Sequence, residues 1–145
     1  MKLSVKEDPQ LNEIQVAIAC PRIDSRVCQI IEVAEAADLR LAGLLDGYLH
    51  VVSAHEVLYI EAVDGKTFLY TARAVLESSS CLQELETNLA HTEFIRASRQ
   101  LLVNLAHLER LRPYLNARLE LVLDNQEHLI ASRQFAPAIK RRIGL

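Results

Sequence analysis

The sequence VLYIEAVDGKTFLYT, Val57 to Thr71, is the stretch that most directly decides the fold of this chain. Two β-rich runs, residues 57–63 and 66–72, flank the pair Asp64-Gly65, and an Asp-Gly pair between such runs is a strong hairpin signal. A second pair of short strands is expected around Asp46-Gly47, over residues 39–45 and 48–53. Antiparallel hairpins are therefore the expected building block.

The remaining sequence continues this pattern with more short strands and few helices. Apolar or alternating runs predict strands at residues 94–97, 101–105, 108–114, 118–124 and 129–132. A helix is expected after Ser80, with Leu82, Leu85 and Leu89 as its buried stripe, and a last helix after Pro137. No strand–helix alternation runs through the chain, which argues against a doubly wound α/β enzyme. A mainly β (α+β) class is favoured.

The first fifty residues indicate a small strand–helix–strand extension. Residues 13–20 are an apolar-rich strand candidate that Pro21 ends, and Asp24 is a good N-cap. Val27, Ile30, Ile31 and Ala34 then recur at helical spacing. Such a helix either packs on the neighbouring strands or forms a dimer contact.

Charge is distributed unevenly along the 145 residues. The net charge is −3. Residues 1–90 hold 7 Lys and Arg against 14 Asp and Glu, a balance of −7, while residues 91–145 hold 9 against 5, a balance of +4. No segment approaches the ~20 apolar residues that span a bilayer, and the N-terminal MKLSVKEDPQ lacks an apolar signal core. A cytoplasmic protein is expected.

Nothing in the sequence indicates an enzyme. The five histidines show no metal-ligand spacing, and the three cysteines Cys20, Cys28 and Cys81 fit no zinc or redox motif and are expected to be half-buried thiols. No G-x-S-x-G element occurs, and four glycines leave no phosphate-cradling loop. Glu84 and Glu86, two apart on a helix, do not share a face. We expect no catalytic site, no metal, no cofactor and no small-molecule substrate.

The basic residues give the better lead, because a Ser-Arg-Gln triplet occurs twice after an apolar run. The first lies in FIRASRQLLVNL, Phe94 to Leu105, and the second in ASRQF, Ala131 to Phe135. An arginine beside small polar side chains at a strand end suits binding to phosphate or to a base edge. The alternative is that these arginines form surface pairs with Glu93, Glu109 or Glu120, which contribute little.

The order of these elements resembles the LytTR family of bacterial DNA-binding domains. That family has a segment ending in I-E-A, a hairpin, a leucine-rich short helix, then F-x-R-x-H-R-S-x-x-V-N and a final S-R. This chain has VLYIEAVDGKTFLYT, CLQELETNL, FIRASRQLLVNL and LIASRQFAPAIKRRI in the same order over about ninety residues. The resemblance implies an elongated set of small antiparallel sheets over residues 54–145, preceded by the extension at 1–53.

The resemblance also implies that three loops contact successive major grooves of duplex DNA. The first loop supplies Lys66 or Thr67. The second supplies Arg99 as the base contact, with Arg96 supporting it or holding a phosphate, and the third supplies Ser132, Arg133 and Gln134. Lys140 and Arg141 are expected to add phosphate contacts, which position a protein on DNA without specifying sequence.

Two positions depart from the family pattern, because Ser98 stands where the family has histidine and Gln100 where it has serine. Both lie in the expected recognition loop, so they alter sequence preference or weaken DNA binding. The expected function is therefore a sequence-specific, homodimeric transcriptional regulator. The alternative is a protein-interaction module of the same fold that has lost DNA binding. Some stand-alone family members are held in check by a small membrane protein, and such a partner is a further expectation of the resemblance.

Overall fold

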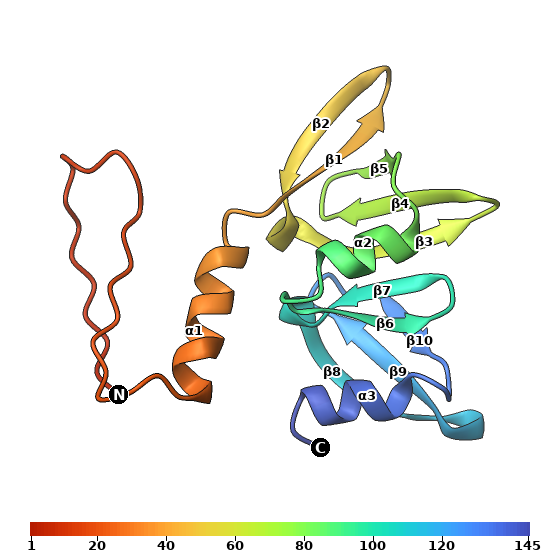
Figure 1. Cartoon of the computed structure of the whole chain (residues 1–145). Helices are drawn as coiled ribbons and strands as arrows, with labels where there is room; N and C mark the ends of the chain where they lie inside the picture. Colours follow the sequence, from red (N-terminus) through yellow and green to blue (C-terminus); the bar gives the residue numbers. More distant parts are fainter.

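The computed structural model describes all 145 residues and contains three α-helices, ten strands and three short 3-10 helices. The strands of the first sheet are short and follow one another as hairpins (Figure 1): β1 Arg40–Leu45, β2 Tyr48–Ser53, β3 Val57–Val63, β4 Lys66–Thr71, β5 Val75–Ser78, β6 Phe94–Ser98 and β7 Leu101–Asn104. The second sheet contains β8 Leu108–Tyr114, β9 Arg118–Leu123 and β10 His128–Ala131. The helices are α1 Ser25–Ala36, α2 Leu82–Asn88 and α3 Ala136–Arg142, with η1 Ala54–Glu56, η2 Leu105–His107 and η3 Leu115–Ala117.

All strand pairs are antiparallel. The seven-stranded sheet has the order β2-β1-β5-β4-β3-β7-β6, and the three-stranded sheet has the order β10-β9-β8. In β3 and β4 the register pairs Val63 with Lys66 across Asp64-Gly65, which confirms the expected hairpin. Both turn residues have positive φ (50° and 77°), the backbone of a type I′ turn, which Asp-Gly favours. The mainly β (α+β) class is therefore confirmed.

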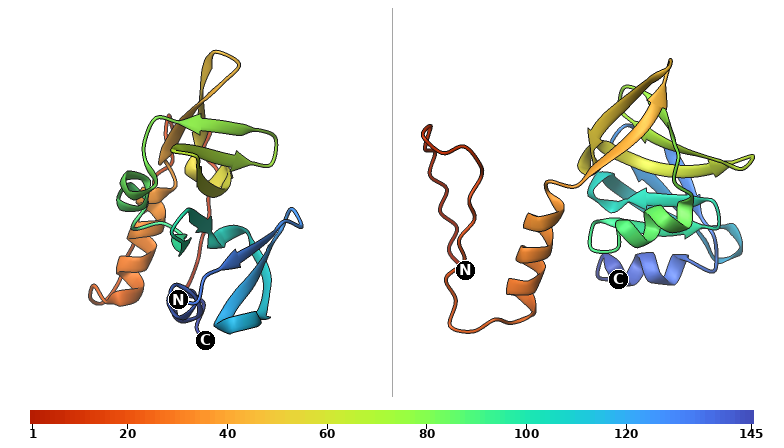
Figure 2. Two further views of the ribbon diagram at one scale, coloured as in Figure 1. Left: turned by 90° about the vertical axis from the view of Figure 1, so that its right-hand side faces the viewer. Right: turned by 45° about the horizontal axis from the view of Figure 1, so that its top comes forward.

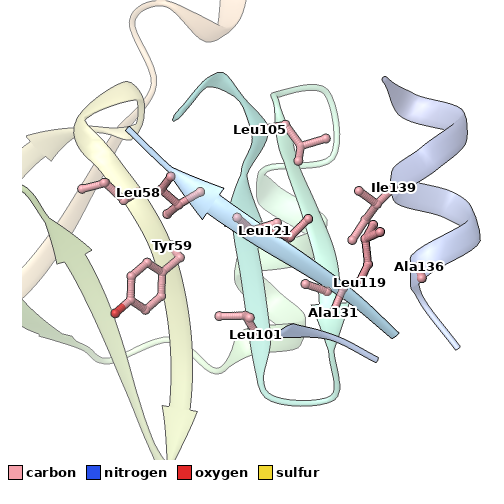
Figure 3. Packing of buried hydrophobic residues seen from close by; sticks show 12 residues of the cluster. Leu58, Tyr59, Leu101, Leu105, Leu119, Leu121, Ala131, Ala136 and Ile139 are labelled. Carbon is pink, nitrogen blue, oxygen red and sulfur yellow. The ribbon is translucent and has the colours of Figure 1, made fainter. Parts of the chain in front are cut away.

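The two faces of the central strands β3 and β7 pack against different elements, so both faces are buried. One cluster includes Ile60 and Leu102 of these strands together with Leu82, Leu85 and Leu89 of the α2 segment. The other includes Tyr59 and Val103 and extends to β9 and α3; Figure 3 shows Leu119 and Leu121 packed with Ile139 there. Full burial of one leucine contributes about 1.5–3 kcal/mol. The leucine periodicity of α2 and β9 thus determines how the helices cover the sheets.

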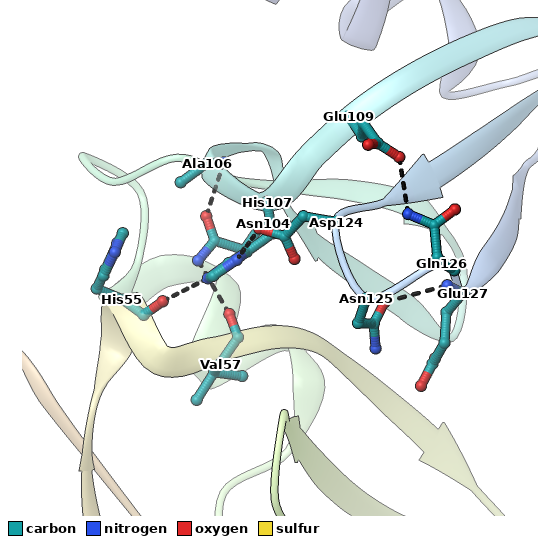
Figure 4. A network of polar contacts seen from close by, with 10 residues as sticks. All are labelled: His55, Val57, Asn104, Ala106, His107, Glu109, Asp124, Asn125, Gln126 and Glu127. Carbon is teal, nitrogen blue, oxygen red and sulfur yellow. Dashed lines mark hydrogen bonds and ion pairs between the residues drawn. The ribbon is translucent and has the colours of Figure 1, made fainter.

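Asn104 at the end of β7 and His107 in η2 tie the two sheets together (Figure 4). Asn104 is buried and donates from Nδ2 to the carbonyl oxygen of Val57 at 2.9 Å, while its Oδ1 accepts from the Ala106 amide. The His107 ring lies 2.9 Å (Nδ1) from Asp124 Oδ2 and 2.6 Å (Nε2) from the His55 carbonyl oxygen. The end of β9 is thereby fastened to the start of β3.

The β1–β2 hairpin joins the sheet through β5. Leu44 pairs with Glu77, and the buried Gly43 lies so close to β5 that a Cβ there would come within 2.4 Å of the Leu76 Cβ. A side chain at residue 43 would therefore separate the strands. The two strands expected around Asp46-Gly47 are confirmed, with Leu45 opposite Tyr48.

The N-terminal region differs from the expectation in one respect. The strand expected at residues 13–20 is wrong: residues 1–24 form neither helix nor strand, since no neighbouring strand offers them a hydrogen-bonded ladder. Asp24 does cap α1, accepting from the amides of Val27 and Arg26 at 3.1 and 3.0 Å. The bond from the Val27 amide and those from the side chain and amide of Arg26 lower the pKa of its carboxyl. α1 contains no fully buried residue, and Val27, Ile30 and Ala34 on its expected packing face are half-buried.

Two smaller expectations about the cysteines and the α2 cap are also wrong. All three cysteines are exposed rather than half-buried, because each lies in the N-terminal region or at the start of α2. The N-cap of α2 is Cys81 rather than Ser80, and no side chain caps its amides.

Candidate nucleic-acid interface

Three connections lie on the same side of the molecule, at the right-hand ends of the hairpins in Figure 1. They are the β3–β4 turn, the β6–β7 turn and the loop from β10 into α3, and the right-hand view of Figure 2 shows them on one side as well. These are the three loops that, by the family resemblance, are expected to contact DNA. The fold therefore brings all of them to one surface.

The first loop presents Lys66 but not Thr67. The Lys66 side chain is 63% exposed, and its Nζ lies 4.0 Å from Glu77 Oε1. Thr67 is only 6% exposed because it stands in the ladder opposite Ser78 of β5. The expectation that Thr67 reaches outward is therefore corrected: it supports the turn from within the sheet.

The second loop exposes Arg99 and Gln100 at its tip and is anchored on both sides. The Gln100 carbonyl oxygen accepts from the Ala62 amide of β3 at 2.8 Å. The half-buried Ser98 accepts through Oγ from the Gln100 amide at 3.3 Å. Because its backbone is fixed in this way, the loop presents the Arg99 side chain from a defined position.

Arg96 lies beneath this turn rather than on its surface. Its side chain is 17% exposed, with Nη1 donating to the Arg99 carbonyl oxygen at 2.6 Å and Nη2 to Glu86 Oε1 at 3.0 Å. The buried Nε has no partner. Of the two roles expected for Arg96, the geometry favours support of Arg99 over a phosphate contact, since both terminal nitrogens are engaged.

The third loop lies directly beside the second. The Ser132 amide donates to the Ala97 carbonyl oxygen at 2.9 Å, and the Ser132 carbonyl oxygen accepts from the amides of Phe135 and Ala136, each at 3.0 Å. Arg133 and Gln134 are exposed between these fixed points, and Ser132 is half-buried. The two Ser-Arg-Gln triplets are thus held side by side by a backbone hydrogen bond.

The remaining basic residues lie in the last turn of α3, which runs from the third loop toward Thr92 at the opposite end of β6 (Figure 1). Lys140 and Arg141 are exposed in the last helical turn, while Arg142 donates to the carbonyl oxygen of Thr92. No ion pair within 4.0 Å involves Arg99, Arg133, Lys140 or Arg141. Their charges are therefore available to an anionic partner.

The alternative pairing of the loop arginines with Glu93, Glu109 or Glu120 does not occur. Arg96 pairs with Glu86 instead, and Glu120 is held by Arg112 of the neighbouring β8 and by His128 Nδ1 at 2.7 Å. These two partners, His128 first, lower the pKa of the Glu120 carboxyl. Glu86, which binds Arg96 beneath the β6–β7 turn, is the residue of this site that sequence reasoning missed. Its place on α2 indicates only a solvated surface, and its partner is ten residues away on another element.

The structure has neither a metal-binding cluster nor a membrane-spanning helix. No group of three or more His, Cys, Asp and Glu side chains is placed to hold a metal ion. None of the helices has both the length and the apolar character needed to cross a bilayer.

A set of hairpins that presents cationic loops on one side is suited to a nucleic-acid-binding class of protein, and comparison with known proteins agrees. The family model of the LytTr DNA-binding domain matches residues 47–144. The chain therefore belongs to the LytTR family, and it is a DNA-binding regulator.

The solved and curated relatives extend this agreement. The LytTr DNA-binding domain of a Bacillus cereus protein superposes with a TM-score of 0.70 at 26% identity, covering 73% of this chain and 97% of that one. An uncharacterized HTH-type transcriptional regulator of Staphylococcus aureus strain MRSA252 is 25% identical over 147 residues, covering all of this chain and 99% of the relative. The sensory transduction protein LytT of Bacillus anthracis is 26% identical over 70% of this chain and 42% of its own length.

The helix-turn-helix in the name of the Staphylococcus relative has no counterpart in this structure. Strands separate α1 from α2 and α2 from α3, so no two helices follow one another across a short turn. The exposed Arg99 and Arg133 lie in loops rather than on a helix.

Proposed function

We propose that this protein is a sequence-specific transcriptional regulator that contacts successive major grooves of duplex DNA through its three loops. The single observation that carries the proposal is the placement of the two Ser-Arg-Gln triplets side by side, joined by the hydrogen bond from Ser132 to Ala97. Each triplet holds an exposed arginine without an acidic partner. An arginine that approaches guanine bidentately is the commonest specific contact to DNA.

The residues divide into base-contacting and phosphate-contacting roles. Arg99 and Arg133 are proposed to contact base edges, and Ser98, Gln100, Ser132 and Gln134 to supply neighbouring polar contacts. Lys66 in the first loop is proposed to hold a phosphate, and Lys140 and Arg141, at the end of α3 that lies away from the loops, to add phosphate contacts farther along the duplex. Arg96 is assigned a positioning role, because its guanidinium is already occupied by Arg99 and Glu86.

The charge distribution supports contact with DNA through the C-terminal part of the chain. The basic residues 91–145, with a balance of +4, include two of the three loops and α3, whereas the acidic residues 1–90 carry −7. Residues 54–145 are proposed as the DNA-binding unit and residues 1–53 as the region of contact with a partner. A homodimer acting in the cytoplasm would match a repeated DNA site.

The experiment that tests the function measures binding of the purified protein to duplex DNA from upstream of its own gene by fluorescence anisotropy. A scrambled duplex of equal length is the control, and both are titrated at two salt concentrations, because phosphate contacts make affinity fall with salt. Tight, salt-sensitive binding with a preference for the upstream duplex is the expected result.

The second candidate is a protein-interaction module that has kept the fold and lost DNA binding. The −7 balance of residues 1–90 and the departures at Ser98 and Gln100 favour it. It predicts no salt-dependent affinity for any duplex, including duplexes selected from a random pool. That outcome would replace the first candidate with the second.

A further inference from the structure

The outer edge of β2 is an open strand edge without the usual protection. β2 ends the seven-stranded sheet and pairs only with β1. Tyr48, Leu49 and Val51 are 75%, 69% and 62% exposed, and the strand carries neither Lys, Arg, Asp, Glu nor Pro. Edges that must stay unpaired in solution commonly carry such charges or prolines. This edge is therefore suited to receive another strand.

The other strand edges differ from β2. β8, at one end of the second sheet, carries Glu109, Arg110, Arg112 and Pro113. β6, at the far end of the first sheet, already accepts the Ser132 amide at Ala97 and so has β10 and its loop beside it. β2 is the edge that combines apolar side chains with a free backbone.

The same chain contains a strand-forming segment that has no partner. In Glu13–Cys20, residues Ile14, Val16 and Ile18 alternate with Gln15, Ala17 and Ala19, a period-two pattern without Gly or Pro. The three branched side chains are 90%, 62% and 39% exposed, and the segment forms no strand. An extended segment gains its main-chain hydrogen bonds by adding to a sheet edge, with alternate side chains covering apolar surface.

The connection to α1 separates this segment from its own β2 edge. Asp24 caps α1, so the four steps from Cys20 to Asp24 reach at most about 14 Å. The 12-residue helix is about 18 Å long and leads into β1, whose Arg40 stands opposite Ser53 of β2. Cys20 itself therefore stops short of its own β2, and in the structure the segment lies on the far side of α1 from that strand (Figures 1 and 2).

We propose that residues Glu13–Cys20 of one chain add as a strand to β2 of a second copy, and that the reciprocal contact completes a symmetric dimer. This inference rests on the proposed function, since it names the partner of residues 1–53 in a homodimeric regulator. The contact covers β2 at the end of the sheet and leaves the β6–β7 turn and the β10–α3 loop uncovered. Both DNA-facing triplets would then remain available in each copy.

The test measures molecular mass by size-exclusion chromatography with light scattering, without DNA. We expect the native chain to be a dimer at micromolar concentration. Val16→Asp places a charge in the segment and Val51→Lys places one on the edge, and each is expected to halve the mass. Val5→Asp is the matched control, because Val5 is 87% exposed but lies outside the alternating segment. It should leave the dimer intact.

Three outcomes would overturn the proposal. A native chain that is a monomer excludes the dimer, and protection of the amides of residues 13–20 from hydrogen exchange in that monomer would place the strand on its own chain. A Val16→Asp variant that stays dimeric while Val51→Lys is monomeric would mean that two β2 edges pair directly. Dimers that survive both changes would place the interface elsewhere. Circular dichroism of each variant shows whether the fold is retained.

The outcome is independent of the DNA-binding proposal. Mass is measured without DNA, so a dimer that fails to bind any duplex would contradict the proposed function and leave the strand exchange standing. A monomer that binds its upstream duplex specifically would do the reverse.

Discussion

Arg96 donates a hydrogen bond from Nη1 to the backbone carbonyl oxygen of Arg99 at 2.6 Å, so one arginine holds the turn that presents the next. The second terminal nitrogen of Arg96 is bound to Glu86 on α2. The Arg96 side chain thereby connects the β6–β7 turn to α2, the helix that covers the sheet.

This relationship predicts the effect of Arg96→Ala. We expect weaker specific binding of DNA with an unchanged dependence of affinity on salt, because the variant loses the position of Arg99 and no phosphate contact. Anisotropy titrations at several salt concentrations measure both quantities. A slope reduced by about one ion would show that Arg96 contacts phosphate directly.

Asn104→Ala should destabilise the protein without acting on the loops. The buried side chain satisfies the Val57 carbonyl and the Ala106 amide, and leaving such groups without partners costs about 1–3 kcal/mol. Urea unfolding measures the loss. Asn12→Ala, at an exposed residue of the N-terminal region, is the control and should stay within about 0.5 kcal/mol of the native chain. Equal stability of both variants would contradict the role given to Asn104.

Gly43→Ala tests the close approach of β1 to β5. The new Cβ would lie 2.4 Å from the Leu76 Cβ, so the strands must separate, and such overpacking costs about 1–3 kcal/mol. Thermal unfolding is the measurement, with the exposed neighbour Ala42→Ser as the control. A native-like melting temperature for Gly43→Ala would show that β1 is not held as closely as described.

Glu120 gives the protein a defined response to acid. Hydrogen bonds from His128 and Arg112 lower the pKa of its carboxyl in the folded state, so its contribution is fully present above the ordinary glutamate pKa and is lost as pH falls through the lower, folded value. As pH falls below the ordinary glutamate pKa of about 4.3, the urea midpoint should fall less steeply in Glu120→Gln than in the native chain. Glu35→Gln, at an exposed position of α1, should follow the native curve. Parallel curves for all three proteins would remove Glu120 from this response.

Much of the fold could be predicted from the sequence, because turn residues and the spacing of apolar residues determine the structure of the segments in which they lie. Asp64-Gly65 determines its turn through positive φ, and the leucines at 82, 85 and 89 determine the buried face of α2 by their spacing. The strand predicted at residues 13–20 is absent from the structure, because local pattern alone is not sufficient there. Its alternation is a property of a strand, but a strand also needs a partner edge, and the sequence does not state which edge is free.

The candidate site likewise has features that the sequence predicts and features that depend on contacts between distant elements. The exposure of Arg99 and Arg133 at strand ends follows from their position after apolar runs. The pairing of Arg96 with Glu86 joins two elements whose relative placement depends on the packing of α2. The burial of Thr67 depends on β5 adding beside β4, a contact between strands that the hairpin sequence alone does not specify.

The most direct test of the account compares Arg99→Ala and Arg133→Ala on the upstream duplex and on its scrambled control. Arg73→Ala is the matched variant, because Arg73 is exposed on the β4–β5 loop, at the opposite end of β4 from the β3–β4 turn. Each loop variant should lose about 1–3 kcal/mol of binding free energy on the upstream duplex and little on the scrambled one, while Arg73→Ala should match the native chain. Unchanged affinity of both loop variants, or equal losses on the two duplexes, would contradict base recognition by the paired loops.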